Sequence, residues 1–332
     1  MNFDFNDEQR EIKSTAHDFL ASRFKPEKVR ELALAESPYD DALWTEICEL
    51  GWPGIAIAEE HGGQGLGTVE AVILAEEMGY ALAPSPWLSN LSAGFFIEAA
   101  GSDEQKSKWL PGIASGEERA AVALTPPGQD QVVGAAGGAS VLVLNDGDGA
   151  IVADASTAKI EKLDLIDTTR GYFAVSAEGE PLAGDVSGAA DRSVVVLAAE
   201  LVGVAQRALD MAVAYAKERE QFDRPIGAYQ AVSHRLAGML WEVEEARSLT
   251  YYAGWAADSE PESLPLASSM AKARASDAAT TVTHDAIQTF GGIGFTWEHD
   301  IHFFLKRARV SAQLLGTPRQ HRERVAALTG LG

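Results

Sequence analysis

Cysteine and basic residues are the scarce features of this sequence. Cys48 is the single cysteine, which excludes an internal disulfide and any multi-cysteine metal site. The reducing cytoplasm is therefore the expected compartment. The chain has 27 Lys and Arg against 49 Asp and Glu, a formal net charge of −22. Because phosphate binding needs clustered Lys and Arg, nucleic acid and anionic lipid are not expected as main partners.

Long apolar runs and common catalytic signatures are absent as well. No stretch approaches the ~18 consecutive apolar residues of a membrane span, so membrane insertion is not expected. The N-terminus MNFDFNDEQREI lacks a signal-peptide pattern. The sequence contains no HExxH, GxSxG or P-loop motif. We predict no metal site, because the histidines are scattered: His234, His284, His299, His302 and His321.

The 332 residues, 46% of them hydrophobic, describe a folded protein of about two domains by length. Periodicity instead divides the chain into three stretches. Residues 1–118 have apolar residues at three- and four-residue spacing, which predicts a helical domain. Helices are expected to start at Asn6 or Asp7, Asp40 or Asp41, Thr68 and Ser102. We expect the last of these to stop at Pro111.

Residues 119–190 change in character and predict a small β-domain. The short apolar runs AAVAL, SVLVL, AIVAD and YFAVSA are separated by turn residues. The glycine-rich segment DQVVGAAGGAS is interpreted as a flexible turn, because it does not match GxGxxG entering a helix. No βαβ alternation supports a nicotinamide-binding sheet.

Residues 191–332 are strongly helical and predict a four-helix bundle. The expected helices run from Val194 to Arg219, from Tyr229 to about Asp258 and from Leu266 to Phe290. A last segment, 301–328, completes the bundle. The predicted fold class is therefore mainly α, with an N-terminal helical domain, a small central β-domain and a C-terminal four-helix bundle.

Two segments of the bundle carry the strongest local signals. In YAKEREQFDRPIG, Arg219 with Gln221 and Phe222 could clamp a phosphate and stack a ring. The alternative is a cation complementing a helix C-terminus and an aromatic filling a corner. In AIQTFGGIGF, Gly291 and Gly292 let backbone amides approach a ligand, or simply end a helix.

These segments, in this order, resemble the acyl-CoA dehydrogenases. The resemblance also covers FNDEQREI, the stretch 43–67 and SDEQKSKWLPGIASGE. It implies an enzyme that binds FAD at a subunit interface, oxidises the α,β bond of an acyl-CoA and passes electrons to an electron-transfer flavoprotein. It implies that one group contacts the FAD of the neighbouring subunit: Arg219, Gln221 and Phe222. A second group would meet the adenosine-pyrophosphate portion: Gln288, Gly291 and Gly292. Asp223 stands where the family usually has glycine.

The sequence departs from the family at the catalytic base. Where many members have Glu before Gly-Thr, this chain has Leu315, whose N–H could still polarise a thioester carbonyl. Asp191, which precedes Arg192, approximates the position of the base in other members. Glu200 lies farther along the same helix in an apolar run, where burial would raise the pKa of its carboxyl group. The alternative for Glu200 is an ion pair with an arginine between bundle helices.

The β-domain is short for the family, and the flavin-contacting motif is reduced to TPPGQD (residues 125–130). A short β-domain and a missing base resemble the short β-type subunits of bacterial α2β2 acyl-CoA dehydrogenases, several of which act on steroid side-chain or other bulky acyl-CoA thioesters. LDLIDTTR (residues 163–170) resembles a sequence motif of those chains. The leading hypothesis is a β-type subunit whose longer α-subunit supplies the base. The alternatives are a self-sufficient homo-oligomer using Asp191 or Glu200, and a non-catalytic scaffold.

Overall fold

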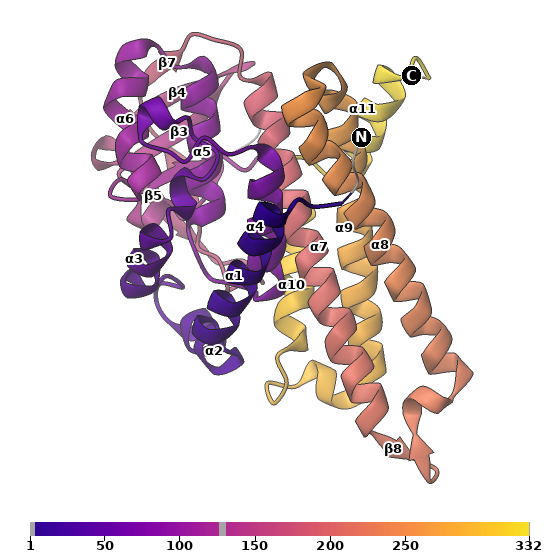
Figure 1. Ribbon diagram of the computed structural model, residues 1–332. Coiled ribbons are helices and arrows are strands. Elements are labelled where there is room, and N and C mark those ends of the chain that lie inside the picture. The colour runs from indigo at the N-terminus through magenta and orange to yellow at the C-terminus, as the bar shows by residue number, and fades with distance from the viewer. Residues whose placement is uncertain (1–3, 126–130, 332) are drawn as a thin grey trace.

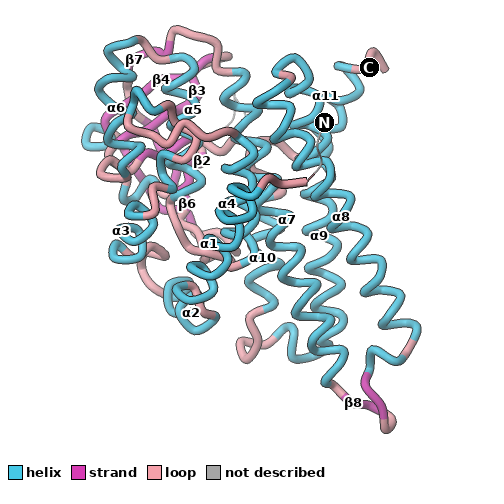
Figure 2. Tube along the Cα trace, in the orientation of Figure 1, coloured by secondary structure: helices cyan, strands magenta, loops and turns pink. Residues whose placement is uncertain are grey.

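The computed structural model describes residues 4–125 and 131–331. The N-terminal helices pack beside the long helices of the C-terminal part (Figures 1 and 2). The strands lie next to the N-terminal helices, at the upper left of the same view. The first group comprises α1 (Asp7–Arg23), α2 (Pro26–Leu34), α3 (Asp41–Glu49), α4 (Thr68–Tyr80), α5 (Trp87–Ala100) and α6 (Asp103–Ser115).

Local capping signals set several of these helix starts, as predicted. Asn6 and Ser102 each form a capping box with the glutamine three residues later, and the Asp40 carboxylate accepts from two backbone N–H groups of α3. Helix α4 begins at Thr68 as expected, but the interpretation of Thr68 as its cap is wrong, because Gly67 is the N-cap. The first N–H groups of α4 donate instead to the Asp258 carboxylate of the bundle.

Other differences arise where packing overrides a local signal. The expected stop at Pro111 is wrong: α6 continues to Ser115, because the proline ring removes only one helical N–H while Ile113 and Ala114 are buried. Helices α2 and α5 were not predicted. Helix α5 is buried on nearly every side and therefore shows no amphipathic period.

The strands form two sheets. One sheet has the order β1-β3-β4-β7, with β1 (Ala120–Val122), β3 (Val141–Asp146), β4 (Gly149–Asp154) and β7 (Glu180–Leu182). The other has the order β2-β6-β5, with β2 (Val132–Gly134), β6 (Tyr172–Ser176) and β5 (Lys159–Leu163). Part of the segment interpreted as a flexible turn is thus strand β2. Strand β3 is buried on both faces: Val141 and Val143 join the main core, whereas Leu142 and Leu144 join a second cluster in the β region.

The C-terminal part is a helical bundle. Its three long helices are α7 (Ser187–Glu218), α8 (Gln230–Ser259) and α9 (Leu264–Phe290). The expected last segment is two helices, α10 (Ile301–Ser311) and α11 (Pro318–Leu328). A short hairpin of β8 (Glu220–Gln221) and β9 (Arg224–Pro225) joins α7 to α8 and projects from the far end of the bundle (Figure 1). The predicted fold class is confirmed.

Helices α4 and α7 cross with their backbones in close approach. A side-chain Cβ added at Gly203 would lie 1.9 Å from the Glu76 carbonyl oxygen, and one at Gly79 would lie 2.1 Å from the Glu200 carbonyl oxygen. Glycine is therefore required on both helices at this crossing. The main hydrophobic core runs without interruption from the N-terminal helices through the first sheet into the bundle.

Candidate active site

A cavity of about 390 Å³ opens between the start of α7, the ends of the first sheet and the loop that joins α10 to α11. Its lining combines apolar and polar side chains, among them Phe96, Thr125, Asn145, Asp191, Leu315 and His321. Two of the three positions considered for the base, Asp191 and Leu315, therefore meet at one cleft, whereas Glu200 does not line it. Residues 126–130 of the expected flavin-contacting motif lie outside the described residues.

The backbone N–H of Leu315 is already hydrogen-bonded within the chain. Leu315 adopts a left-handed φ of 54°, and its N–H donates to the Leu124 carbonyl at 2.6 Å. The expectation that this N–H is available to polarise a thioester is therefore wrong, because the loop folds back onto the residues that follow β1. The leucine side chain has no atom that accepts a proton.

Two buried side chains hold this loop in place. The Lys272 ammonium on α9 donates to the Ser276 hydroxyl at 3.0 Å and to the carbonyls of Ala312 and Gly316 at 3.2 and 3.1 Å. Burial lowers the pKa of Lys272 to about 7. Burial likewise lowers the pKa of His321 to about 4, so its ring is neutral at pH 7. The His321 Nε2 lies 2.9 Å from the Leu315 carbonyl oxygen and donates to it.

Asp191 lies in the first turns of α7 and is only 3% exposed. Its carboxylate accepts from the Ser268 hydroxyl at 2.8 Å and from both terminal nitrogens of Arg324, one of them at 2.9 Å. The bidentate guanidinium fixes the orientation of the carboxylate. Asp191 is placed at the cleft, but its oxygens are bonded to this chain's own groups.

Glu200 is buried and ion-paired. One carboxylate oxygen accepts from Arg170 and the other from Arg307, the latter at 3.1 Å. This arrangement corresponds to the alternative interpretation, an arginine partner between structural elements. Both carboxylate oxygens of Glu200 are thus occupied by guanidinium groups of this chain.

Asp167 completes this network and ties the β region to the bundle. Burial alone would raise the pKa of Asp167, but the charge of Arg307 and hydrogen bonds from Thr169 hold it below its ordinary value of 3.8. The Asp167 carboxylate also accepts from the Tyr172 hydroxyl at 2.9 Å. The segment LDLIDTTR thus supplies both an acid and Arg170 to one buried cluster of two positive and two negative side chains.

The predicted phosphate-binding residues lie at the opposite end of α7. Phe222 is 88% exposed at the tip of the hairpin, and both Phe222 and Asp223 have left-handed φ values of 54° and 65°. Asp tolerates this conformation better than most residues other than glycine, which accounts for its presence there. Arg219 and Gln221 are exposed beside it.

The glycine loop lies at the same end of the bundle. Tyr215 of α7 packs on Phe290 of α9 with ring centroids 4.5 Å apart, which places the ends of both helices together. Gly291 has φ 65° and ψ −139°, a conformation open only to glycine. A Cβ added at Gly291 or Gly292 would meet nothing within 4 Å, and Gln288 is also exposed. The two motifs together form an open surface.

The two ends of the molecule are too far apart for one cofactor to join. Asp191 and Arg219 lie at the ends of the same helix, about 42 Å apart at 1.5 Å per residue. That separation exceeds the length of an extended dinucleotide. A dinucleotide bound at the hairpin end would therefore not reach the cleft of its own chain.

Within residues 4–125 and 131–331, no group of three or more His, Cys, Asp or Glu side chains is arranged to hold a metal ion. In the same part of the chain, no helix is long and apolar enough to cross a membrane.

The order of helices, two sheets and helical bundle, with a cleft where sheet and bundle meet, defines a three-part enzyme architecture. Residues 6–117 match the model of the acyl-CoA dehydrogenase N-terminal domain, and residues 187–329 match that of the C-terminal domain. The chain belongs to the acyl-CoA dehydrogenase family, an oxidoreductase family whose members depend on FAD.

Full-length relatives agree with this assignment. The chain is 35% identical over 322 residues to the acyl-CoA dehydrogenase IpdE2 of Mycolicibacterium smegmatis, covering 96% of this chain and 98% of that protein. Among solved structures, a variant of the Tcur3481-Tcur3483 steroid ACAD has a TM-score of 0.88 at 29% identity, covering 98% of each chain. The ChsE4-ChsE5 complex from Mycobacterium tuberculosis has a TM-score of 0.88 at 24% identity, covering 100% of each chain, a likeness of fold.

Proposed function

We propose that this chain is the β-type subunit of a heteromeric acyl-CoA dehydrogenase that forms the α,β double bond of an acyl-CoA thioester. The loop at Leu315 is the observation that carries the proposal. The α-proton of a thioester is weakly acidic, so the reaction needs a base and hydrogen-bond donors to the carbonyl. Leu315 offers no base, and its N–H already donates to Leu124. A longer partner chain supplies both.

FAD is the proposed cofactor, and the open surface at the hairpin end of the bundle suits its adenosine-diphosphate half. Arg219 offers a guanidinium to the diphosphate, Phe222 an exposed ring for stacking, and the Gly291–Gly292 backbone a close approach without side chains. Gln221 and Gln288 offer amide groups beside them. A bound FAD would supply the hydride acceptor for the reaction. This chain's residues orient the cofactor toward the cleft of the partner.

A bulky acyl group, such as a steroid side chain, is the proposed substrate class, and the name of the similar steroid ACAD supports it. The paired names of that protein and of the ChsE4-ChsE5 complex support a second, different chain as partner. We propose an electron-transfer flavoprotein as acceptor and the cytoplasm as compartment, since acyl-CoA chemistry takes place there and a single cysteine requires no oxidising environment.

Co-purification with a longer acyl-CoA dehydrogenase chain from the same organism tests the proposal. We expect a stable heteromer, flavin absorbance in the complex, and turnover that is lost when the partner's glutamate is changed to glutamine. Phe222→Ala should release flavin from the complex. Leu34→Ala, a matched change at a side chain 63% exposed on α2, should retain it.

Two other outcomes point to the alternatives. If the chain alone is yellow and active, and Asp191→Asn or Glu200→Gln abolishes turnover while the protein stays folded, it is a self-sufficient enzyme. If the complex forms but carries no flavin attributable to this chain's hairpin, the chain is a scaffold. Because Asp191 and Glu200 are held by arginines, we expect either amide variant to lower stability rather than the rate per folded complex.

A further inference from the structure

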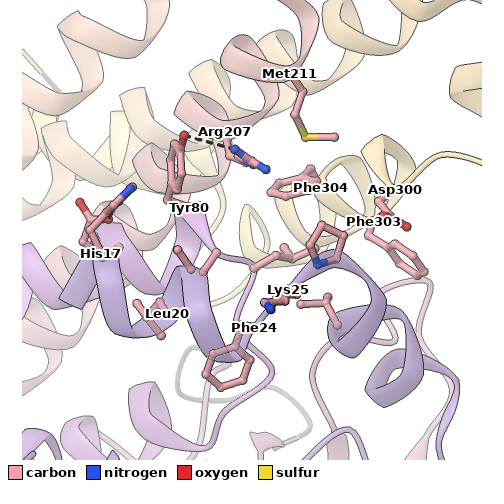
Figure 3. A pocket seen from close by; sticks show the side chains of 16 residues that line it. His17, Leu20, Phe24, Lys25, Tyr80, Arg207, Met211, Asp300, Phe303 and Phe304 are labelled. Carbon is pink, nitrogen blue, oxygen red and sulfur yellow. Dashed lines mark hydrogen bonds and ion pairs between the residues drawn. The ribbon is translucent and has the colours of Figure 1, made fainter. Parts of the chain in front are cut away.

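A second cavity, of about 200 Å³, lies where α1, α2, α4, α7 and α10 meet (Figure 3). It shares no lining residue with the cleft at Leu315. Its walls are mainly apolar and come from helices at both ends of the sequence, among them Leu20, Phe24, Met211, Phe303 and Phe304. The proposed dehydrogenation does not use this cavity.

The acidic side chains at this cavity are hydrogen-bonded or ion-paired to neighbours. Glu77 pairs with His17, whose Nδ1 lies 2.9 Å from one carboxylate oxygen, and with Lys13 at 3.7 Å. Asp300 accepts from the Arg30 guanidinium, whose Nε lies 3.0 Å away. Neither carboxylate is left to repel an anion in the cavity.

Two cations at the cavity have no such partner. Within the described parts of the chain, neither Arg207 nor Lys25 lies within 4.0 Å of a carboxylate oxygen. The Arg207 guanidinium reaches from α7 toward Met211 and Phe304 (Figure 3). It donates to the Tyr80 hydroxyl at 3.3 Å and lies over the Tyr80 ring, 5.2 Å from its centroid. That hydroxyl donates to Asp210, one turn along α7. In a protein of net charge −22, a half-buried guanidinium without a carboxylate partner is free to form a charge-assisted hydrogen bond with an anion from outside the chain.

We infer that this cavity binds an apolar monocarboxylate, with its carboxylate on Arg207 and its hydrocarbon body among Leu20, Phe24, Phe303 and Phe304. The volume sets the size of the ligand. An apolar cavity of ~150 Å³ binds benzene, so about 200 Å³ accommodates an aliphatic or aryl-alkyl acid of about six to eight carbons. The site is separate from the reaction cleft and does not depend on the proposed function.

The charge and shape of the cavity distinguish this ligand from other classes. A phosphate monoester carries two negative charges, but the interior of the cavity offers one guanidinium, because Lys25 is exposed at the rim. A neutral hydrocarbon would leave Arg207 without a counter-ion in a partly desolvated site. A monocarboxylate matches both the single interior cation and the apolar wall.

Octanoate is the probe, and the methyl groups of methionine are the reporter. The chain has five methionines, of which Met211 is the one that lines this cavity in the described residues. In protein carrying ¹³C-methyl methionine, as the isolated chain or as the purified complex, octanoate should shift the Met211 signal at submillimolar concentration. Met239 and Met270 should stay in place. Met211→Leu assigns the signal.

Charge dependence provides the control. Octanamide, the neutral analogue, should bind at least tenfold more weakly, as expected when a charged hydrogen bond is lost. Arg207→Gln should weaken octanoate by a similar factor, whereas Arg235→Gln, a change of an exposed arginine on α8, should leave binding unaltered. The octanamide comparison needs no variant and therefore holds even if Arg207→Gln unfolds.

Several results would overturn the inference. These are no Met211 shift at millimolar octanoate, equal affinity for octanoate and octanamide, or shifts confined to methionines elsewhere. Because the readout is binding at Met211 rather than turnover, a failure here leaves the dehydrogenase proposal untouched, and the reverse also holds.

Discussion

Lys272 offers the most direct quantitative test of this structure. It is fully buried on α9 and holds the loop that carries Leu315 through two hydrogen bonds, to the carbonyls of Ala312 and Gly316. Burial lowers its pKa from 10.5 to about 7. Between these two values the unfolded chain binds a proton that the folded chain does not, so the free energy of unfolding rises as the pH rises.

The size of this effect follows from the two pKa values. From pH 7 to pH 9, the wild-type protein should gain about 2 kcal/mol of stability from Lys272 alone. Below pH 7 both states are increasingly protonated and the contribution levels off. Lys272→Met removes the titrating group, so the variant should lack this gain. Its absolute stability is a less direct test, because the change also leaves the carbonyls of Ala312 and Gly316 without a donor.

Urea unfolding followed by tryptophan fluorescence at pH 7, 8 and 9 measures the difference. Lys159→Met, on the exposed side of β5, serves as the matched control and should follow the wild-type slope. If Lys272→Met gains as much stability between pH 7 and pH 9 as the wild type does, within about 0.5 kcal/mol, then Lys272 is not a buried titrating group and the reasoning is refuted.

Four further expectations rest on other parts of the molecule. Arg307→Met should lower the free energy of unfolding by about 3–5 kcal/mol, because Asp167 and Glu200 lose a buried partner; the exposed control Arg319→Met should leave the urea midpoint unchanged. Because the pKa of Asp167 is lowered in the folded protein, its ionised carboxylate stabilises the fold above pH 3.8, and this stabilisation is lost as the pH falls through the lowered pKa. The free energy of unfolding should therefore fall less steeply on acidification in Arg307→Met. Gly291→Ala should cost about 1–3 kcal/mol from backbone strain, whereas Gly292→Ala, with open space and no left-handed φ, should be neutral in thermal melts. Burial raises the pKa of Cys48 to about 11, so its alkylation at pH 8 should be on the order of 100-fold slower than that of a thiol at the ordinary value of 9.0; equal rates would contradict that burial.

Helix caps and helix periods could be predicted, because they depend on residues that are close together in the sequence. The caps at Asn6, Asp40 and Ser102 are local hydrogen bonds, and the long helices of the bundle show their period directly. Helix α5 was missed because twelve of its fourteen residues are buried, which leaves no polar face to reveal a period.

The candidate site was predictable only in part, because its determining contacts join distant residues. Glu200 and Arg307 are separated by 107 residues, and Asp191 and Arg324 by 133. Nothing in the sequence indicates which arginine meets which acid. The motif position of Leu315 showed that the side chain is not a base, but the bond from its N–H to Leu124 required the fold.

The backbone crossing of α4 and α7 also has a consequence during protein synthesis. Arg192 of α7, which donates to the Thr68 hydroxyl of α4, follows it by 124 residues. At ~5–20 residues per second, the ribosome needs about 6–25 s to make that intervening chain. For that time the apolar surface of α4 has no bundle to cover it. Nascent chains of this protein should therefore engage a holding chaperone before α7 emerges, and slowing translation should lengthen that engagement.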